Sequence, residues 1–152
     1  MRRKRSSGGR LVGAAIFAAA LAVRLLFWQA TPDRGWAGSA LYKGDAPVWL
    51  AYAAALRSGA SFELGLPLRP PGMAWVAAAL GGGGRRDIAI LKLVWCGLGA
   101  LVALLVYAAA RRSFGLAVGL VSGTVAALSH GLLALSTSLN NETLYLALVL
   151  GA

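Results

Sequence analysis

Charged side chains are scarce in this chain of 152 residues, and acidic ones are the scarcest. Only 13% of the residues are charged, whereas 59% are hydrophobic and the mean hydropathy is +0.70. A soluble domain of this length would carry charge at roughly a quarter of its positions. Long apolar runs with few charges instead indicate an integral membrane protein.

Cysteine is almost absent as well. Cys96 is the only one, and it lies inside an apolar run. The sequence therefore has no internal disulfide and no CxxC-type metal site. We interpret Cys96 as a small hydrophobic residue that is buried between helices.

The few charges are mostly positive, with fifteen Lys and Arg against five Asp and Glu and a formal net charge of +10. Several of the basic residues precede the first apolar segment: Arg2, Arg3, Lys4, Arg5 and Arg10. Such a cluster marks the cytoplasmic end of a membrane protein. Because no basic and aromatic binding surface accompanies the charge, nucleic acid is not a predicted partner.

The apolar runs predict an all-α integral membrane protein, a polytopic helical bundle. After a cytoplasmic basic N-terminus, residues 1-10, transmembrane helices are predicted over about 11-30, 88-110 and 115-137, and another starts at 143. The pair Arg111-Arg112 lies in the tight turn between the helices over 88-110 and 115-137 and places that turn in the cytoplasm. Residues 31 to 87 and 138 to 142 are then outside. The chain stops inside an apolar run. We therefore expect residues 11-152 to be the N-terminal part of a larger membrane protein, or a truncated gene product.

The first predicted helix allows two pairs of interpretations. Arg24 interrupts it, and this side chain either snorkels to lipid headgroups or faces the protein interior as a functional cation. A cleaved signal peptide competes with an uncleaved anchor, because residues 20–22 would suit a cleavage site. The apolar continuation over residues 25–28 favours the anchor. Both interpretations place the following loop outside the cytoplasm.

Two short helices are predicted in this first extracytoplasmic loop, both lying in the membrane interface. In the first, over about 45-57, Asp45 can cap the helix, Pro47 suits the first turn and Gly59 ends it. Its apolar and aromatic residues share one face, as interfacial helices do. The second, over about 71-80, starts with two prolines and is too short to span a bilayer.

The predicted topology gathers three charged side chains at the outer membrane surface: Asp45, Arg69 and Glu142. A partly desolvated carboxylate there can take a proton from an acceptor hydroxyl, and an arginine can hold a phosphate. Each also has a structural alternative. Asp45 can be only a helix cap, Glu142 can stabilise the start of the last helix, and Arg69 can anchor a loop to headgroups.

Four stretches occur in an order and spacing that match one family: GDAPVWLAYAAALRSG, LRPPGMAWVAAALGG, LVYAAARRSFG and LALSTSLNNETLYLAL. They resemble the GT-C superfamily of membrane glycosyltransferases. The nearest likeness is to the family 39-like bacterial relatives of protein O-mannosyltransferases and of the lipid A aminoarabinose transferase. The resemblance covers the N-terminal portion of such an enzyme, from Leu11 almost to the end of this chain. It depends on the order of the stretches rather than on any single motif.

The resemblance implies inverting transfer of a sugar from a polyprenyl-phosphate-linked donor to an acceptor hydroxyl at the extracytoplasmic face. Asp45 would be the general base, Glu142 a second cavity carboxylate, and Arg69 the contact to the lipid phosphate. Asp33 is the alternative base, although no predicted helix follows it. Many relatives have a second acid directly after the aspartate, where this chain has Ala46. A divalent cation is the one cofactor left open, and membrane lipids are the other expected partners.

The alternative is a non-enzymatic polytopic membrane protein, either a transporter segment or an assembly partner. A transporter is expected to contain broken helices or polar residues at mid-membrane. The predicted full-length helices are apolar in their centres and the acids lie at one surface, which favours interfacial chemistry.

Other residues in the predicted helices have structural interpretations. Lys92 is expected to snorkel outward, and His130 to be a hydrogen-bonded packing residue rather than to line a cavity. Small residues let helices approach closely. Four glycines are expected at such contacts: Gly97, Gly99, Gly119 and Gly123.

Overall fold

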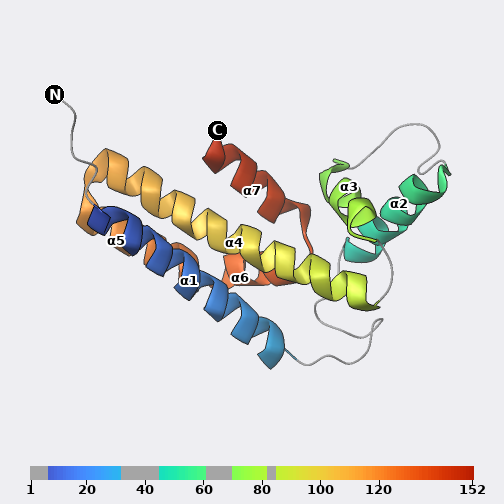
Figure 1. Cartoon of the computed structure of the whole chain (residues 1–152), viewed down its shortest axis with the longest axis horizontal. Helices are drawn as coiled ribbons and strands as arrows, with labels where there is room; N and C mark the ends of the chain where they lie inside the picture. The colour runs from blue at the N-terminus through green and yellow to red at the C-terminus, as the bar shows by residue number, and fades with distance from the viewer. Residues whose placement is uncertain (1–6, 32–44, 61–69, 82–84) are drawn as a thin grey trace.

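The chain folds into helices throughout the part that the computed structural model describes, which is residues 7–31, 45–60, 70–81 and 85–152 (Figure 1). In order, the helices are α1 (Ser7–Ala30), α2 (Ala46–Ser58), α3 (Gly72–Ala79), α4 (Arg85–Phe114), α5 (Leu116–Leu128), α6 (His130–Thr137) and α7 (Asn141–Gly151). The predicted all-α class is confirmed for these residues.

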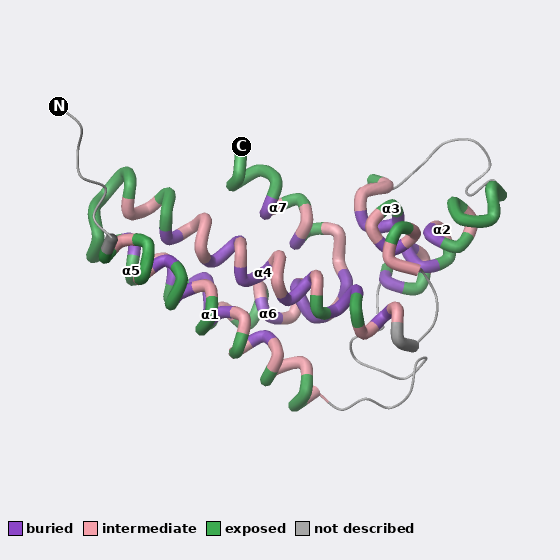
Figure 2. Tube along the Cα trace, viewed as in Figure 1, coloured by how far each residue is buried: buried purple, intermediate pink, exposed green. Residues whose placement is uncertain are grey.

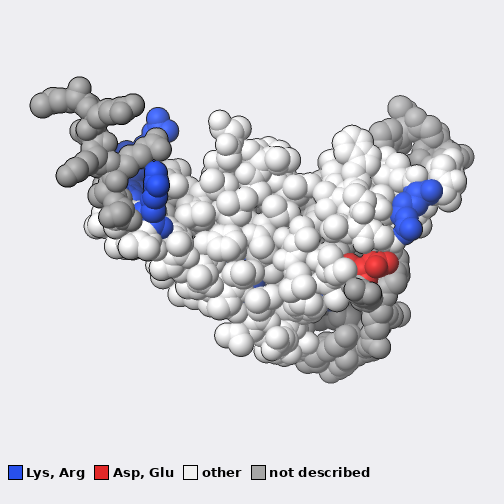
Figure 3. All heavy atoms as spheres, in the orientation of Figure 1, with Lys and Arg blue, Asp and Glu red and all other residues white. Residues whose placement is uncertain are grey.

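Within the described residues, two helices are long and apolar enough to cross a membrane, Gly8–Ala30 within α1 and Asp87–Phe114 within α4. The pair α5 and α6 meets the same criteria only when the two are taken together, across a bend of 52°. Figure 3 shows the charged side chains of the visible face near its two ends, with an almost uncharged stretch between them. The two long helices support a membrane protein.

α1, α4 and α5 pack side by side in alternating directions (Figure 1). Tyr107 of α4 lies between the other two: a Cβ on Gly13 of α1 would be 3.5 Å from its ring, and one on Gly123 of α5 would be 2.8 Å from its Cβ. α4 turns directly into α5 at Gly115, and α1 begins beside this turn. The end of α4 and the starts of α1 and α5 thus lie at one end of the bundle. We call it the arginine end, after Arg10 near the start of α1 and Arg111 and Arg112 near the end of α4.

α2 and α3 coincide with the two short helices expected in the first loop. α2 has Pro47 in its first turn, and it ends at Gly59, whose φ of 68° is left-handed. Only glycine adopts this conformation without strain, so Gly59 ends the helix as predicted. The placement of α2 and α3 in a membrane interface stays a prediction.

Both short helices share a group of buried side chains with the start of α4, far from the arginine end (Figures 1 and 2). We call this packed group the α2–α3 cluster. Its buried members are Ala46, Trp49, Leu50, Ala53, Met73, Ala74, Ala77, Ile88, Leu91, Trp95 and Leu139. Leu139 lies in the connection from α6 to α7, so the cluster joins the loop helices to the last helix of the chain.

The transmembrane helix predicted over about 115-137 is not continuous in the structure, and its place across a membrane stays a prediction. The helix is interrupted at Ser129, whose backbone (φ −58°, ψ 117°) is not helical. Two smaller expectations fail. Lys92 is only 7% exposed, with its ammonium 5.7 Å from the ring centroid of Trp28, so it does not snorkel outward. Gly97 has no atom within 4 Å of where its Cβ would lie, so it is not a helix contact.

Candidate functional site

Asp45 immediately precedes α2 and is exposed. Its carboxylate makes no capping hydrogen bond to the helix, although its carbonyl oxygen accepts one from the Trp49 amide at 3.0 Å. The residue therefore begins the helix through its backbone, at the edge of the α2–α3 cluster. The sequence allowed the Asp45 side chain to cap the helix, but the structure shows no such side-chain cap.

Glu142 lies in the first turn of α7 and is exposed. Two hydrogen bonds fix the start of this helix to the cluster. The indole Nε1 of Trp95 donates to the carbonyl of Asn140 at 2.7 Å, and the amide of Met73 donates to Oδ1 of Asn141 at 3.3 Å. A carboxylate in a first helical turn is also favoured by the helix dipole.

Leu139, just before this helix, has an unusual backbone. Its φ is 57°, and its side chain is fully buried in the α2–α3 cluster. A left-handed conformation is rare for a bulky residue and persists only where the surrounding packing enforces it. Such outliers gather at functional sites, so the strained turn next to Glu142 supports placing a site here.

Two of the predicted site residues lie at the starts of helices that belong to the same packed group. The helices that Asp45 and Glu142 begin both pack into the α2–α3 cluster, which places the two acids at the same end of the molecule. Arg69 and Asp33 lie outside the described residues. Among the residues that are described, no group of three or more His, Cys, Asp or Glu is arranged to hold a metal ion.

Arg24 faces the protein interior, which decides between its two interpretations. Its side chain is fully buried. The guanidinium donates to the carbonyl of Ala20 at 3.0 Å and, on the last turn of α5, to those of Ala127 at 3.3 Å and Ala126 at 3.5 Å. The last carbonyls of a helix lack intrahelical partners and carry partial negative charge. Arg24 therefore supplies hydrogen bonds and a compensating charge at the break between α5 and α6.

A small cavity adjoins this arginine. Its volume is about 10 Å³, and it is lined by Arg24, Gly99, Val102, Leu132, Thr143 and Leu146. Two polar atoms on this lining, Nε of Arg24 and Oγ1 of Thr143, are buried without a hydrogen-bond partner in the described part of the chain. A cavity of this size is near the minimum for one water molecule, which would satisfy both groups.

Sequence reasoning identified Arg24 because a lone charge in an apolar run is conspicuous, but it missed the role of Thr143. Nothing local distinguishes this threonine from the rest of the segment. It belongs to α7, directly after Glu142, and is only 3% exposed. At the start of α7, Glu142 therefore lies at the end of the molecule that carries the α2–α3 cluster, and the next residue, Thr143, lines the Arg24 cavity.

Comparison with known proteins gives no match to a family model, a curated protein or a solved structure. The resemblance to GT-C glycosyltransferases therefore stays a hypothesis that depends on the sequence pattern.

Proposed function

We propose that the chain is part of a membrane glycosyltransferase of the GT-C type. It would transfer a sugar from a polyprenyl-phosphate donor to an acceptor hydroxyl at the extracytoplasmic face of the cell membrane, with the arginine end in the cytoplasm. The observation that carries the proposal is the packing of the two loop helices against the starts of α4 and α7. This packing keeps Asp45 and Glu142 at one end of the bundle.

The reaction needs a base for the acceptor and a cation for the departing phosphate. Asp45 takes the proton of the acceptor hydroxyl as its oxygen attacks the anomeric carbon. The bond from that carbon to the lipid phosphate breaks with inversion, and Arg69 stabilises the phosphate that leaves. By the resemblance to the family, Glu142 would line the reaction cavity from the other side. The role of Asp45 agrees with its exposed carboxylate, which is not used as a helix cap.

The surface of the loop helices suits a lipid-linked substrate. Trp75 of α3 is 61% exposed and Leu56 of α2 is 38% exposed. Aromatic and aliphatic side chains on short exposed helices favour the headgroup region of a bilayer, where the tryptophan ring is especially stable. A polyprenyl phosphate has its phosphate at the same depth.

The test replaces Asp45 with asparagine in the full-length protein. Asn caps a helix about as well as Asp, so a structural role predicts little change. Loss of a general base predicts a fall in turnover of about a hundredfold or more with a polyprenyl-phosphate sugar. Asp33→Asn examines the alternative base in the same assay.

The matched control is Asp87→Asn, another carboxylate in the first turn of a helix at the same end of the bundle. This variant should retain turnover, because Asp87 has no role in the proposed chemistry. Full activity of Asp45→Asn together with loss in Asp33→Asn would move the base to Asp33. Full activity in both would contradict the proposed mechanism.

A second candidate is transport of an anionic solute, which the break at Ser129 favours. Broken helices and buried charges are typical of transporter sites, and here the broken helix ends against the buried guanidinium of Arg24.

Proteoliposomes distinguish the two functions. Accumulation of a sugar acid or another small anion, abolished by Arg24→Gln but not by Asp45→Asn, would favour transport. Sugar transfer that depends on Asp45, without solute uptake, would favour the enzyme.

A further inference from the structure

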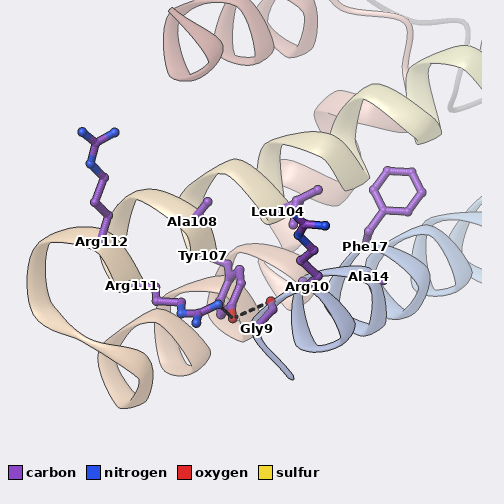
Figure 4. Close-up of a pocket in the computed structure, with 10 residues that line it drawn as sticks. Gly9, Arg10, Ala14, Phe17, Leu104, Tyr107, Ala108, Arg111 and Arg112 are labelled. Carbon is purple, nitrogen blue, oxygen red and sulfur yellow. Dashed lines mark hydrogen bonds between the residues drawn. The ribbon is translucent and has the colours of Figure 1, made fainter. Parts of the chain in front are cut away.

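A large groove opens at the arginine end, which is the opposite end of the bundle from the proposed transferase site. It has a volume of about 1080 Å³ and lies between α1 and α4 (Figure 4). Gly13 of α1 lets the two helices approach closely, because a Cβ there would lie 3.2 Å from Leu104, and Ala14 adds only a methyl group to the groove wall. The described residues that line it include no acidic side chain.

Two of the arginines lie at one end of the groove, and the third, Arg10, extends beside the apolar Leu104 (Figure 4). Figure 4 shows Arg111 and Arg112 near the end of α4, whereas Phe17 lies further along α1 toward the middle of the bundle. Leu104 of α4 adds to the apolar part. A cationic end next to an apolar wall complements a molecule with an anionic head and a hydrocarbon tail.

The arginines are not equivalent. Nη1 of Arg111 donates to the Tyr107 hydroxyl at 3.0 Å, and that hydroxyl donates to the Gly9 carbonyl at 3.4 Å (Figure 4). The Arg111 guanidinium also lies 5.8 Å from the centroid of the Tyr107 ring. These contacts hold Arg111 in place between α1 and α4. Arg10 and Arg112 are exposed and available to a ligand.

We propose that this groove binds one anionic phospholipid of the surrounding leaflet. Its phosphate lies at the arginine end, where Arg10, Arg111 and Arg112 supply three positive charges, with Arg111 fixed in place. One acyl chain lies along Ala14, Phe17 and Leu104. Basic pockets between transmembrane helices bind anionic headgroups in this way.

Charge complementarity selects a lipid over the other occupants of such a groove. A second apolar helix would leave the exposed arginines without anions in a low-dielectric contact. A free phosphate would leave the apolar wall uncovered. A phospholipid satisfies both parts, because its headgroup and its chain match the two ends.

Native mass spectrometry of the intact protein, purified in detergent with an equal mixture of phosphatidylglycerol and phosphatidylcholine of matched chains, tests the proposal. The wild type should retain one phosphatidylglycerol in preference to phosphatidylcholine. Arg10→Gln and Arg112→Gln should each reduce this preference about fivefold. Arg57→Gln is the matched control, because Arg57 is an exposed arginine on α2, at the other end of the molecule. It should leave the preference unchanged.

A third kind of variant separates the groove from charge alone. Ala14 is exposed on the groove wall, so Ala14→Trp fills the groove without disturbing the core. It should reduce retention of both lipids while all arginines remain. Thermal unfolding in lipid-free detergent should be unchanged for each variant, so that lost binding is not lost folding.

Several results would overturn the proposal. No preference for phosphatidylglycerol in the wild type would remove its basis. An equal effect of Arg57→Gln and Arg112→Gln would show that net charge alone attracts the lipid. Undiminished retention in Ala14→Trp would place the lipid elsewhere. Displacement of the lipid by inorganic phosphate would identify a phosphate site, and a dimer that Ala14→Trp abolishes would identify a second copy as the occupant.

Discussion

Three helices meet at Gly99, and a single methyl group there should weaken their packing. A Cβ on Gly99 would lie 2.5 Å from Nε of Arg24 and 2.5 Å from Cβ of Ser136, on α1 and α6 respectively. Neither neighbour can move easily. Arg24 is fixed by its hydrogen bonds to the end of α5, and Cβ of Ser136 is tied directly to the backbone of α6.

Gly97→Ala provides a nearly ideal control for Gly99→Ala. Both glycines belong to α4, so the gain in helix propensity of up to about 1 kcal/mol is shared and cancels in the comparison. Only Gly99 is crowded, because no atom lies within 4 Å of the Cβ position at Gly97. Overpacking a well-packed interior costs about 1–3 kcal/mol. We therefore expect Gly99→Ala to be about 1–3 kcal/mol less stable than Gly97→Ala.

The assay is unfolding by titration with dodecyl sulfate in mixed micelles, followed by far-ultraviolet circular dichroism. Gly97→Ala should unfold at the same denaturant fraction as the wild type or at a higher one, and Gly99→Ala at a lower one. Equal midpoints for the two variants would refute the close approach of α1, α4 and α6, and with it the buried position of Arg24.

Three further predictions concern other contacts. Arg24→Lys keeps the charge but replaces the planar guanidinium by a shorter side chain with a single nitrogen, which cannot reproduce the three hydrogen bonds of the arginine. The free energy of unfolding should therefore fall by about 1.5–3 kcal/mol, measured in the same titration. Trp95→Phe removes the hydrogen bond to Asn140 and should lower stability by about 1 kcal/mol, with faster hydrogen exchange at the start of α7. For topology, single cysteines at Ser61 and Ser113 in a Cys96→Ser background should be labelled from outside and protected, respectively. The reverse labelling pattern would invert the proposed orientation.

The short loop helices could be predicted because their limits are set by local residues. Pro47 can only begin a helix, and Gly59 readily takes the left-handed conformation that ends one. These preferences act within one or two turns, and the structure has both residues where the sequence expected them. The long helices follow from apolar length alone, which needs no knowledge of their neighbours.

The break at Ser129 depends on a distant residue and was therefore not predicted. No proline interrupts the segment, and its composition suits a continuous helix. The last carbonyls of α5 are instead bound by Arg24, which is 103 residues away from Ala127. The sequence Ser129-His130-Gly131 is a weak polar interruption of the apolar run, and it was the only local signal.

Lys92 is a second residue whose surroundings depend on another helix and were therefore not predicted from the sequence. Length and charge predict snorkelling for a lysine in a transmembrane helix, but the rule assumes that lipid surrounds the helix. Here the ring of Trp28 on α1 lies beside the ammonium of Lys92 on α4, and this cation–π contact takes the place of contacts to lipid headgroups. Such pairing depends on the register of two helices, which periodicity within one helix does not determine.

The start of α7 connects the two candidate functions and gives them different consequences. Glu142 is exposed at the end that carries the α2–α3 cluster, and Thr143 faces the cavity beside Arg24. If the protein is a transferase, Arg24 is structural, so Arg24→Lys should reduce activity only as far as it reduces the folded fraction. If the protein is a transporter, Arg24 contacts the solute, and activity should fall much further than stability does. The loss of activity relative to the loss of stability in Arg24→Lys therefore distinguishes the two functions, because the Arg24 side chain only supports the fold in a transferase but binds the solute in a transporter.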